Sequence, residues 1–245
     1  MKANQSINKL TVSIFVFALL FCLSKAFSQQ TVQASDIMKD IKKGTTVSYN
    51  NVTIVGDLDM TFMDEKMDDL PKRRRWWQNG GSNSIEEQIE GKVLFNNCVF
   101  EDNVYAYYHD EDSKYTFIAN FENDVQFTNC TFKEDALFKY SEFERNADFQ
   151  GSTFDERTTF KYAEFDENVS FADTNFDKSA VFKYTEFKDG VSFNNAKFDD
   201  NLDIKYMNVR GDFDVKNMSV SNNIDAKYTE INGRSFNKYL LESKD

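Results

Sequence analysis

Two short stretches of the chain carry the side chains best suited to binding chemistry. One holds three consecutive arginines followed by two tryptophans, and the other joins a tyrosine and the only histidine to three consecutive acids. Guanidinium groups bind anions through paired hydrogen bonds, and indole rings stack on cations or lie at a membrane interface. The candidate binding residues are therefore Arg73, Arg74, Arg75, Trp76, Trp77, Tyr108, His109, Asp110, Glu111 and Asp112. The alternative interpretation is structural, with the arginines paired to the acidic stretch and the tryptophans packed on the protein.

The sequence offers little support for catalysis. His109 is the sole histidine, and the chain has no nucleophile elbow, zinc-ligand spacing or glycine-rich phosphate loop. Asp and Glu are plentiful, but they follow the surface repeat described next, in which a catalytic carboxylate pair would not stand out. We predict a protein that is not an enzyme and has neither cofactor nor metal. A glycan-active enzyme is the less favoured alternative.

A repeat that fills most of the chain sets the positions of these residues. From Val125 to Arg234 an apolar residue, usually phenylalanine, recurs at alternating intervals of five and six, with a small or aliphatic residue two positions before each. A short fixed period over this length predicts a solenoid, in which each repeat buries its apolar face against its neighbours. A Lys-Tyr pair recurs every 22 residues, which predicts coils of 22 residues with four short sides: Lys139-Tyr140, Lys161-Tyr162, Lys183-Tyr184, Lys205-Tyr206 and Lys227-Tyr228.

The repeat resembles the pentapeptide-repeat family, whose five-residue unit places a small residue two positions before a central Leu or Phe. Ala180-Val181-Phe182-Lys183-Tyr184 shows this pattern. The resemblance implies an all-β solenoid, a right-handed quadrilateral β-helix with both named positions pointing inward. This chain departs from the family by adding one residue after every second pentad, as at Asp135 and Asn146. Some family members are dimeric, acidic rods that mimic DNA and bind topoisomerases.

Extending the register over residues 47–234 predicts seven coils and two insertions. At the spacing of neighbouring strands, seven coils make a rod about 34 Å long. Residues 63–86 and 109–118 do not fit the repeat, and both interrupt it between the third and fourth sides of consecutive coils, so we expect them to be neighbours. The coils are predicted to begin at Val47, Val93, Val125, Ala147, Val169, Val191 and Phe213.

Both ends of the solenoid need covers, because an open coil exposes unpaired strand edges. Residues 29–46 are predicted to hold a cap helix with Ser35 as its N-cap and Gly44 just beyond its end. Residues 235–245 are predicted to form a second cap helix, which alternatively mediates dimerisation.

Several columns of like residues follow from the register. A tyrosine ladder is expected to run from Tyr108 to Tyr228 as corner stacking, although stacked aromatic rings can also bind a sugar or a peptide. The lysines of the Lys-Tyr pairs form a column beside the ladder, and a glutamate column runs next to it: Glu142, Glu164, Glu186 and Glu230. The two columns are expected to offset each other's charge across the corner. Cys98 and Cys130 fall at equivalent positions of adjacent coils, and we favour buried free thiols over a disulfide.

The first 28 residues have the pattern of a signal peptide, with Lys2 and Lys9 before an apolar run and a cleavage site before Gln29. The alternative is a lipid-modified Cys22, which we disfavour because Phe21 is bulky. Cleavage would change the net charge from −12 to −15, because it removes three lysines and no acid. No membrane span would remain, and such a protein repels nucleic acid on average.

These observations predict an exported binding or scaffold protein, placed in the periplasm, at the cell surface or in the medium. The expected partner is a protein or another component of the cell envelope, bound by the two insertions. The alternative is an acidic DNA-mimic rod that binds a topoisomerase or another nucleic-acid-binding protein, although a signal peptide would keep it from cytoplasmic targets.

Overall fold

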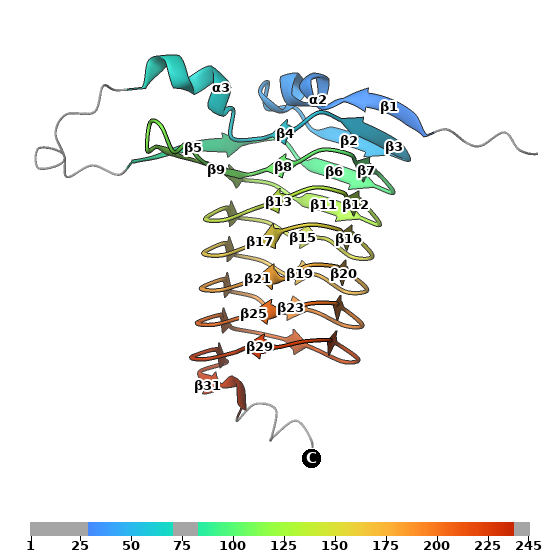
Figure 1. Ribbon diagram of the computed structural model, residues 1–245, viewed down its shortest axis with the longest axis vertical. Coiled ribbons are helices and arrows are strands. Elements are labelled where there is room, and N and C mark those ends of the chain that lie inside the picture. Colours follow the sequence, from blue (N-terminus) through green and yellow to red (C-terminus); the bar gives the residue numbers. More distant parts are fainter. Residues whose placement is uncertain (1–28, 71–82, 238–245) are drawn as a thin grey trace, which may run out of the picture. The chain divides into compact units, whose positions relative to one another are not determined.

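The described part of the protein is built from four sheets, in each of which one strand per coil pairs in parallel with the strands of the neighbouring coils (Figure 1). The computed structural model describes residues 29–70 and 83–237, so the predicted signal peptide lies outside the described residues. From Thr31 onward the chain forms a single unit. Within it the strands wind into a four-sided β-helix, whose sides we number in chain order.

The bounds of the strands follow the predicted coils. The first side is β2 (Val47–Asn50), β6 (Val93–Asn96), β11 (Val125–Thr128), β15 (Ala147–Asp148), β19 (Val169–Ser170), β23 (Val191–Ser192) and β27 (Phe213–Asp214). The second is β1 (Gln30–Gln33), β3 (Val52–Val55), β7 (Val99–Phe100), β12 (Thr131–Phe132), β16 (Thr153–Phe154), β20 (Asn175–Phe176), β24 (Lys197–Phe198) and β28 (Ser219–Val220). The third is β4 (Leu58–Asp59), β8 (Val104–Tyr105), β13 (Ala136–Leu137), β17 (Thr158–Thr159), β21 (Ala180–Val181), β25 (Leu202–Asp203) and β29 (Ile224–Asp225). The fourth is β5 (Ser84–Ile89), β10 (Thr116–Phe121), β14 (Glu142–Phe143), β18 (Glu164–Phe165), β22 (Glu186–Phe187), β26 (Asn208–Val209), β30 (Glu230–Ile231) and β31 (Arg234–Ser235), with β9 (Tyr107–His109) paired to β10.

The strand pairing confirms the predicted register. Val125 lies opposite Val93 on one side and Ala147 on the other, and the same offset continues to Phe213. The first and third sides each have seven strands, so the chain forms the seven predicted coils. Alternate residues of each strand point inward because successive side chains of a strand face opposite ways.

Stacked phenylalanine rings fill the interior of the β-helix. Phe160, for example, is 0% exposed and stacks between Phe138 and Phe182, with ring centroids 5.0 and 5.1 Å away. Rings from the first side, such as Phe149, meet this column edge-on. Offset and edge-to-face contacts of this kind add to the gain from burying the rings.

The N-terminal end is covered by α2 (Ala34–Ile41), which buries Ala34, Ile37 and Ile41. The prediction of Ser35 as N-cap is wrong: the helix begins two residues earlier than that cap implies, and Gln33 holds the cap position without a side-chain bond. The reason is that β1, which the sequence analysis missed, runs directly into the helix. Gly44 lies beyond the helix end as predicted, with a positive φ of 68° and its amide bonded to the carbonyl of Ile41.

At the other end, β31 folds back antiparallel on β30, and Phe236 is buried against Phe213. Phe236 and Asn237 are helical, where a cap helix was predicted. The remainder of that predicted helix lies outside the described residues.

Both insertions leave from the same corner, between the third and fourth sides. The first contains α3 (Met63–Lys66) and the 3-10 helix η1 (Met67–Asp69) and returns at β5. The second is a hairpin of β9 and β10. The strands β5 and β10 pair over six residues, from Ser84 opposite Thr116 to Ile89 opposite Phe121. The strands β5 and β10 therefore each begin three residues before the predicted start of the fourth side, because their pairing continues outward into the hairpin.

Candidate functional site

The ten predicted site residues fall into two groups in the structure. Arg73, Arg74, Arg75, Trp76 and Trp77 lie outside the described residues. The other five, Tyr108 to Asp112, belong to β9 and to the turn that joins it to β10.

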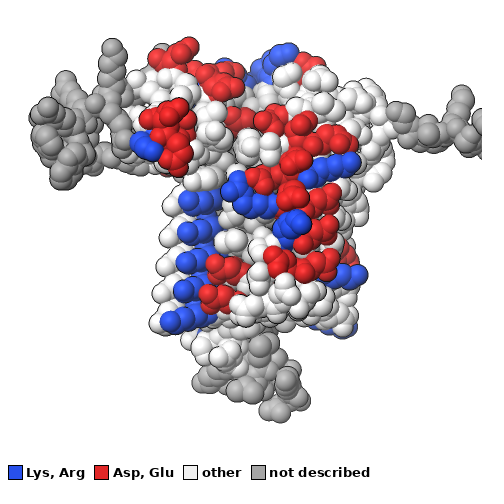
Figure 2. Space-filling model, in the orientation of Figure 1, with Lys and Arg blue, Asp and Glu red and all other residues white. Residues whose placement is uncertain are grey.

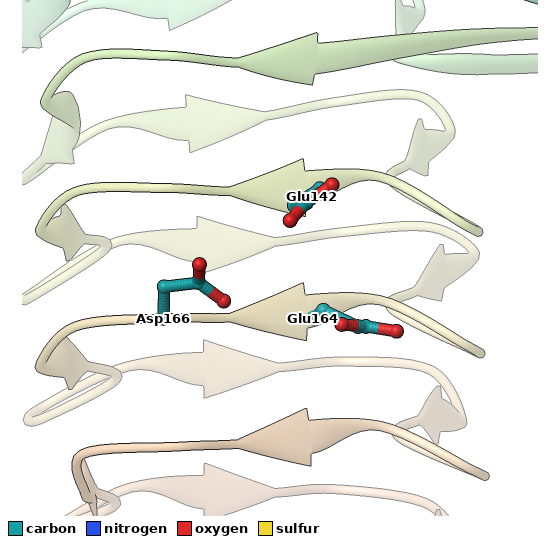
Figure 3. Close-up of side chains that lie close together, drawn as sticks. All are labelled: Glu142, Glu164 and Asp166. Carbon is teal, nitrogen blue, oxygen red and sulfur yellow. The ribbon is translucent and has the colours of Figure 1, made fainter.

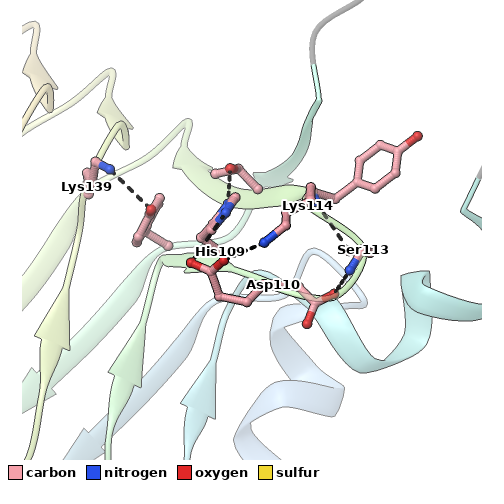
Figure 4. A network of polar contacts seen from close by, with 9 residues as sticks. His109, Asp110, Ser113, Lys114 and Lys139 are labelled. Carbon is pink, nitrogen blue, oxygen red and sulfur yellow. Dashed lines mark hydrogen bonds and ion pairs between the residues drawn. The ribbon is translucent and has the colours of Figure 1, made fainter. Parts of the chain in front are cut away.

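The hairpin is held by its own hydrogen bonds. Tyr108 lies opposite Phe117 and His109 opposite Thr116, and Phe117 is 0% exposed, so the hairpin is anchored at its base. Nδ1 of His109 lies 2.9 Å from the Thr116 hydroxyl oxygen, as Figure 4 shows. Two strands alone are marginal in water, and pairing of β10 with β5 gives the hairpin a third.

The acidic turn closes on itself. The Asp110 carboxylate accepts a bond of 2.6 Å from the Ser113 amide, and hydrogen bonding to Ser113 lowers the pKa of Asp110. Glu111 pairs with Lys114 at 2.7 Å, which lowers the pKa of Glu111 (Figure 4). These carboxylates are therefore partly used in forming the turn.

The tyrosine ladder exists, but its first member differs from the prediction. Tyr107, not Tyr108, lies over Tyr140, with ring centroids 5.9 Å apart, whereas Tyr108 turns edge-on to Tyr105. The five later tyrosines occupy corner positions with φ between 60° and 66°, a left-handed conformation that strains residues with a side chain: Tyr140, Tyr162, Tyr184, Tyr206 and Tyr228. Tyr107 and Tyr108 lack it because the chain continues there as an extended strand.

The stacking decides what the ladder presents to solvent. From Tyr140 to Tyr228 the rings stack face to face at 4.5–4.9 Å, so solvent meets mainly their edges and hydroxyl groups. A sugar bound by aromatic stacking needs a free ring face. The inner ladder is therefore a structural feature that shields the corner, as the sequence analysis favoured.

The lysine column lies on the ladder rather than on the glutamates. The ammonium groups of Lys139, Lys161, Lys183, Lys205 and Lys227 lie 4.6–5.8 Å from the ring centroids of the tyrosines that follow them. Among the described residues none of the five forms an ion pair. The expected charge compensation across the corner therefore involves no direct ion pair of these lysines among the described residues, and their ammonium groups contact the tyrosine rings instead.

The glutamate column finds other partners on the fourth side. Lys188 bridges Glu164 and Asp166 at 3.0 and 2.7 Å, and Arg210 pairs with Glu186. Glu142, Glu164 and Asp166 form a group of carboxylates that Figure 3 shows on adjacent coils, close enough to hold a cation. The Lys188 ammonium already pairs with two of them, and bonds to Asp166 and Glu164 raise the pKa of Lys188. Burial, with Asp166 and Glu164 nearby, raises the pKa of Glu142.

A half-open hollow of about 490 Å³ lies on the third side, next to the hairpin. Its floor is the outward residue of three successive third-side strands, Leu137, Thr159 and Val181. The hairpin supplies Tyr107, Tyr108, His109 and Glu111, and the coils supply Tyr105, Lys139, Arg157 and Lys161. Figure 2 shows the lysine column along one edge of this face and acidic side chains gathered along the other.

The hollow brings together three predicted residues with others that the sequence analysis missed. Tyr108, His109 and Glu111 line it, whereas Asp110 and Asp112 do not. The floor could have been found from the sequence, because alignment of the coils places Leu137, Thr159 and Val181 at one outward position. The two following coils have Asp203 and Asp225 at that position. No feature of the sequence indicated that the hairpin would lie beside this floor.

Burial affects the tyrosines of the hollow. It raises the pKa of Tyr105 to about 12, with Asp57 and Asp135 adding to the effect, and it also raises the pKa of Tyr107. Both phenols therefore stay protonated at neutral pH and can donate hydrogen bonds. The hollow contains apolar, aromatic and cationic groups but no nucleophile activated by a base.

None of the described helices is long and apolar enough to cross a membrane. The fold defines a solenoid repeat protein, with a hollow on the surface of its third side. Comparison of the sequence with known families is more specific: residues 119–164 and 160–207 match pentapeptide repeats. Residues 119–207 of the chain therefore consist of pentapeptide repeats, as the sequence suggested. No curated protein and no solved structure matches the chain.

Proposed function

We propose that this chain is an exported, non-enzymatic scaffold whose β-helix presents a binding site on its third side, next to the hairpin. One observation carries the proposal: the hairpin interrupts a regular coil and walls a hollow whose floor is apolar. The coils bury their phenylalanines without any insertion, so the ordered hairpin is not required by the core. Long loops on repeat scaffolds often carry binding.

The proposed partner is a protein or another component of the cell envelope, reached through the leader at residues 1–28. Export can be tested separately from binding. The native chain should be recovered outside the cytoplasm with Gln29 as its first residue, which mass spectrometry of the N-terminal peptide determines. An uncleaved chain in the cytoplasm would overturn the export part of the proposal.

The binding part is tested by affinity capture from envelope and secreted fractions. In a hairpin variant, residues 109–118 are deleted, which removes His109, Glu111 and the pairing of β9 with β10 and leaves a coil of 22 residues like its neighbours. The control is Asp225→Asn, on the same side but outside the hollow. We expect a partner that the chain and the control capture and the hairpin variant loses. Equal capture by all three would refute this site.

The acidic ridge between the second and third sides favours a second candidate function. Asp155, Asp177 and Asp199 recur there in successive coils, and burial, together with the charge of Asp177, raises the pKa of Asp155. A row of carboxylates about 4.8 Å apart resembles a phosphate backbone in charge. This DNA-mimic alternative predicts that the chain displaces DNA from a topoisomerase at low salt; no displacement would remove it.

A further inference from the structure

We propose that the hollow on the third side binds a small amphiphilic anion: an aryl or alkyl body that carries one sulfonate, carboxylate or phosphate group. This inference rests on the proposed function, because it names the ligand class for the same site. The argument has three parts: the apolar floor, the unpaired cations and the lower boundary.

The floor suits an apolar body of limited length. Leu137, Thr159 and Val181 follow one another at the strand spacing, so the floor is about 10 Å long. Rings of Tyr105 and Tyr107 stand beside it. The volume of about 490 Å³ falls within the range of small-molecule sites.

The charges of the hollow favour an anion, although the whole chain has a net charge of −12. Its one lining carboxylate, Glu111, is paired with Lys114 at 2.7 Å. Arg157 on the opposite edge donates to Asp135 at 3.1 Å. These pairs are internally compensated, so the net charge of the hollow is set by its lysines.

Lys139 and Lys161 have no carboxylate partner among the described residues. The Lys139 ammonium donates to the Tyr107 hydroxyl at 3.1 Å and lies 4.6 Å from the ring centroids of both Tyr107 and Tyr140. These partners are neutral, so its charge remains available to a ligand. Lys161 lies one coil further along, 5.1 Å from the Tyr162 ring centroid.

The backbone cannot replace these ammonium groups. At this corner the amides of Tyr140 and Tyr162 already donate to the carbonyls of Lys161 and Lys183, at 3.0 and 3.1 Å. An anion in the hollow must therefore be bound by side chains, chiefly by the two lysines. Their removal is consequently a direct test.

The lower boundary of the hollow is electrostatic. Val181 lies opposite Asp203 in the sheet, and the next strand has Asp225 at the same position. A carboxylate in the floor repels an anion and ends the apolar surface. The ligand is thereby confined to the coils beside the hairpin.

His109 provides a reporter specific to this site, since it is the only histidine and lines the hollow. The full chain, labelled with ¹³C at the histidine Cε1, is titrated at one pH with naphthalene-2-sulfonate or with neutral naphthalene-2-sulfonamide. We expect the sulfonate to shift the His109 signal saturably and to bind at least about tenfold more tightly than the sulfonamide. Added salt should weaken binding of the sulfonate but not binding of the sulfonamide.

Two matched double variants assign the charge effect. Lys139→Gln with Lys161→Gln should weaken sulfonate binding about tenfold and leave sulfonamide binding unchanged, since two ammonium contacts are lost. Lys205→Gln with Lys227→Gln alters the same lysine column outside the hollow and should change neither sulfonate binding nor sulfonamide binding. Equal affinity for the two probes, or unchanged sulfonate binding in the first variant, would overturn the inference.

A second variant guards against misfolding of the first. Val181→Asp introduces the residue that the next coil already has at this position, so the coil should accept it, and sulfonate binding should be lost. If it binds the sulfonate like the native chain, the inference is overturned. If the sulfonate binds as expected but partner capture does not depend on the hairpin, the proposed function fails and the anion site stands. If capture depends on the hairpin but the sulfonate does not bind, the anion site fails and the proposed function stands.

Discussion

Replacing Phe160 by alanine tests whether the stacked rings hold the β-helix together. The side chain is 0% exposed and has aromatic neighbours above, below and beside it. Deletion of such a ring loses its transfer free energy and leaves a cavity, together about 3–5 kcal/mol. We expect the upper half of this range, because the coil cannot collapse into the space. The amides of Phe138 and Phe160 are bonded to the carbonyls of Thr159 and Val181, at 2.9 and 2.8 Å, which fixes the distance between coils.

The free energy of unfolding can be measured by guanidinium chloride titration, followed by far-UV circular dichroism. A loss of this size is a large fraction of the 5–15 kcal/mol typical of a domain. Phe160→Ile is the matched control, because Ile204 occupies the same column two coils later, and it should cost much less than alanine. If Phe160→Ala changes the midpoint by no more than the isoleucine control does, the stacked column does not stabilise the fold as argued here.

Three further perturbations test the surface columns. Tyr162→Gly should be about 1 kcal/mol less destabilising than Tyr162→Ala in thermal unfolding, since both lose the stacking but only glycine accepts a φ of 62° without strain; equal losses would contradict this. The pKa of Glu142 is raised in the folded protein, so ionisation of Glu142 costs stability as pH rises through that pKa. Glu142→Gln should therefore stabilise the protein by about 0.5 kcal/mol at pH 7. The variant should show no gain below pH 4.5, the ordinary pKa of a glutamate. Glu186→Gln, which loses Arg210, is the control of opposite sign, and a gain for both would contradict the charge argument. Interaction with the neighbouring Cys130 thiol lowers the pKa of Cys98, yet both free thiols are buried, so iodoacetamide should modify them rapidly only in denaturant. Mass spectrometry measures the modification, and rapid modification of the native chain would show that the coil opens there.

The register was predictable because the interior imposes it. Each inward position must be apolar, and a shift of one residue would turn every phenylalanine outward. The same constraint placed Cys98 and Cys130 on adjacent coils, where both are buried, free thiols. Even the irregular N-terminal coils could be aligned, since Val47 and Val93 lie opposite each other as expected.

The errors lie where distant pairing decides a local conformation. Tyr108 aligns with the corner tyrosines, but Tyr107, Tyr108 and His109 pair with β10, so the corner turn does not form there. Ser35 suits an N-cap by type, but the strand β1 brings the chain into the helix earlier. Neither outcome follows from local preference, because both depend on residues far along the chain.

The hollow that we propose as a binding site was the least predictable part, and the repeat itself explains why. From Val125 onward, successive coils repeat the same strand pairing, so the scaffold alone cannot distinguish one of these coils from the next. Selectivity requires that the regularity be broken at two points along the rod. The hairpin breaks it beside Leu137, and the change from Val181 to Asp203 breaks it on the same face. The first break is an insertion, and the second is a change of one outward residue. The hollow could be recognised only once the structure placed both on the same side of the β-helix.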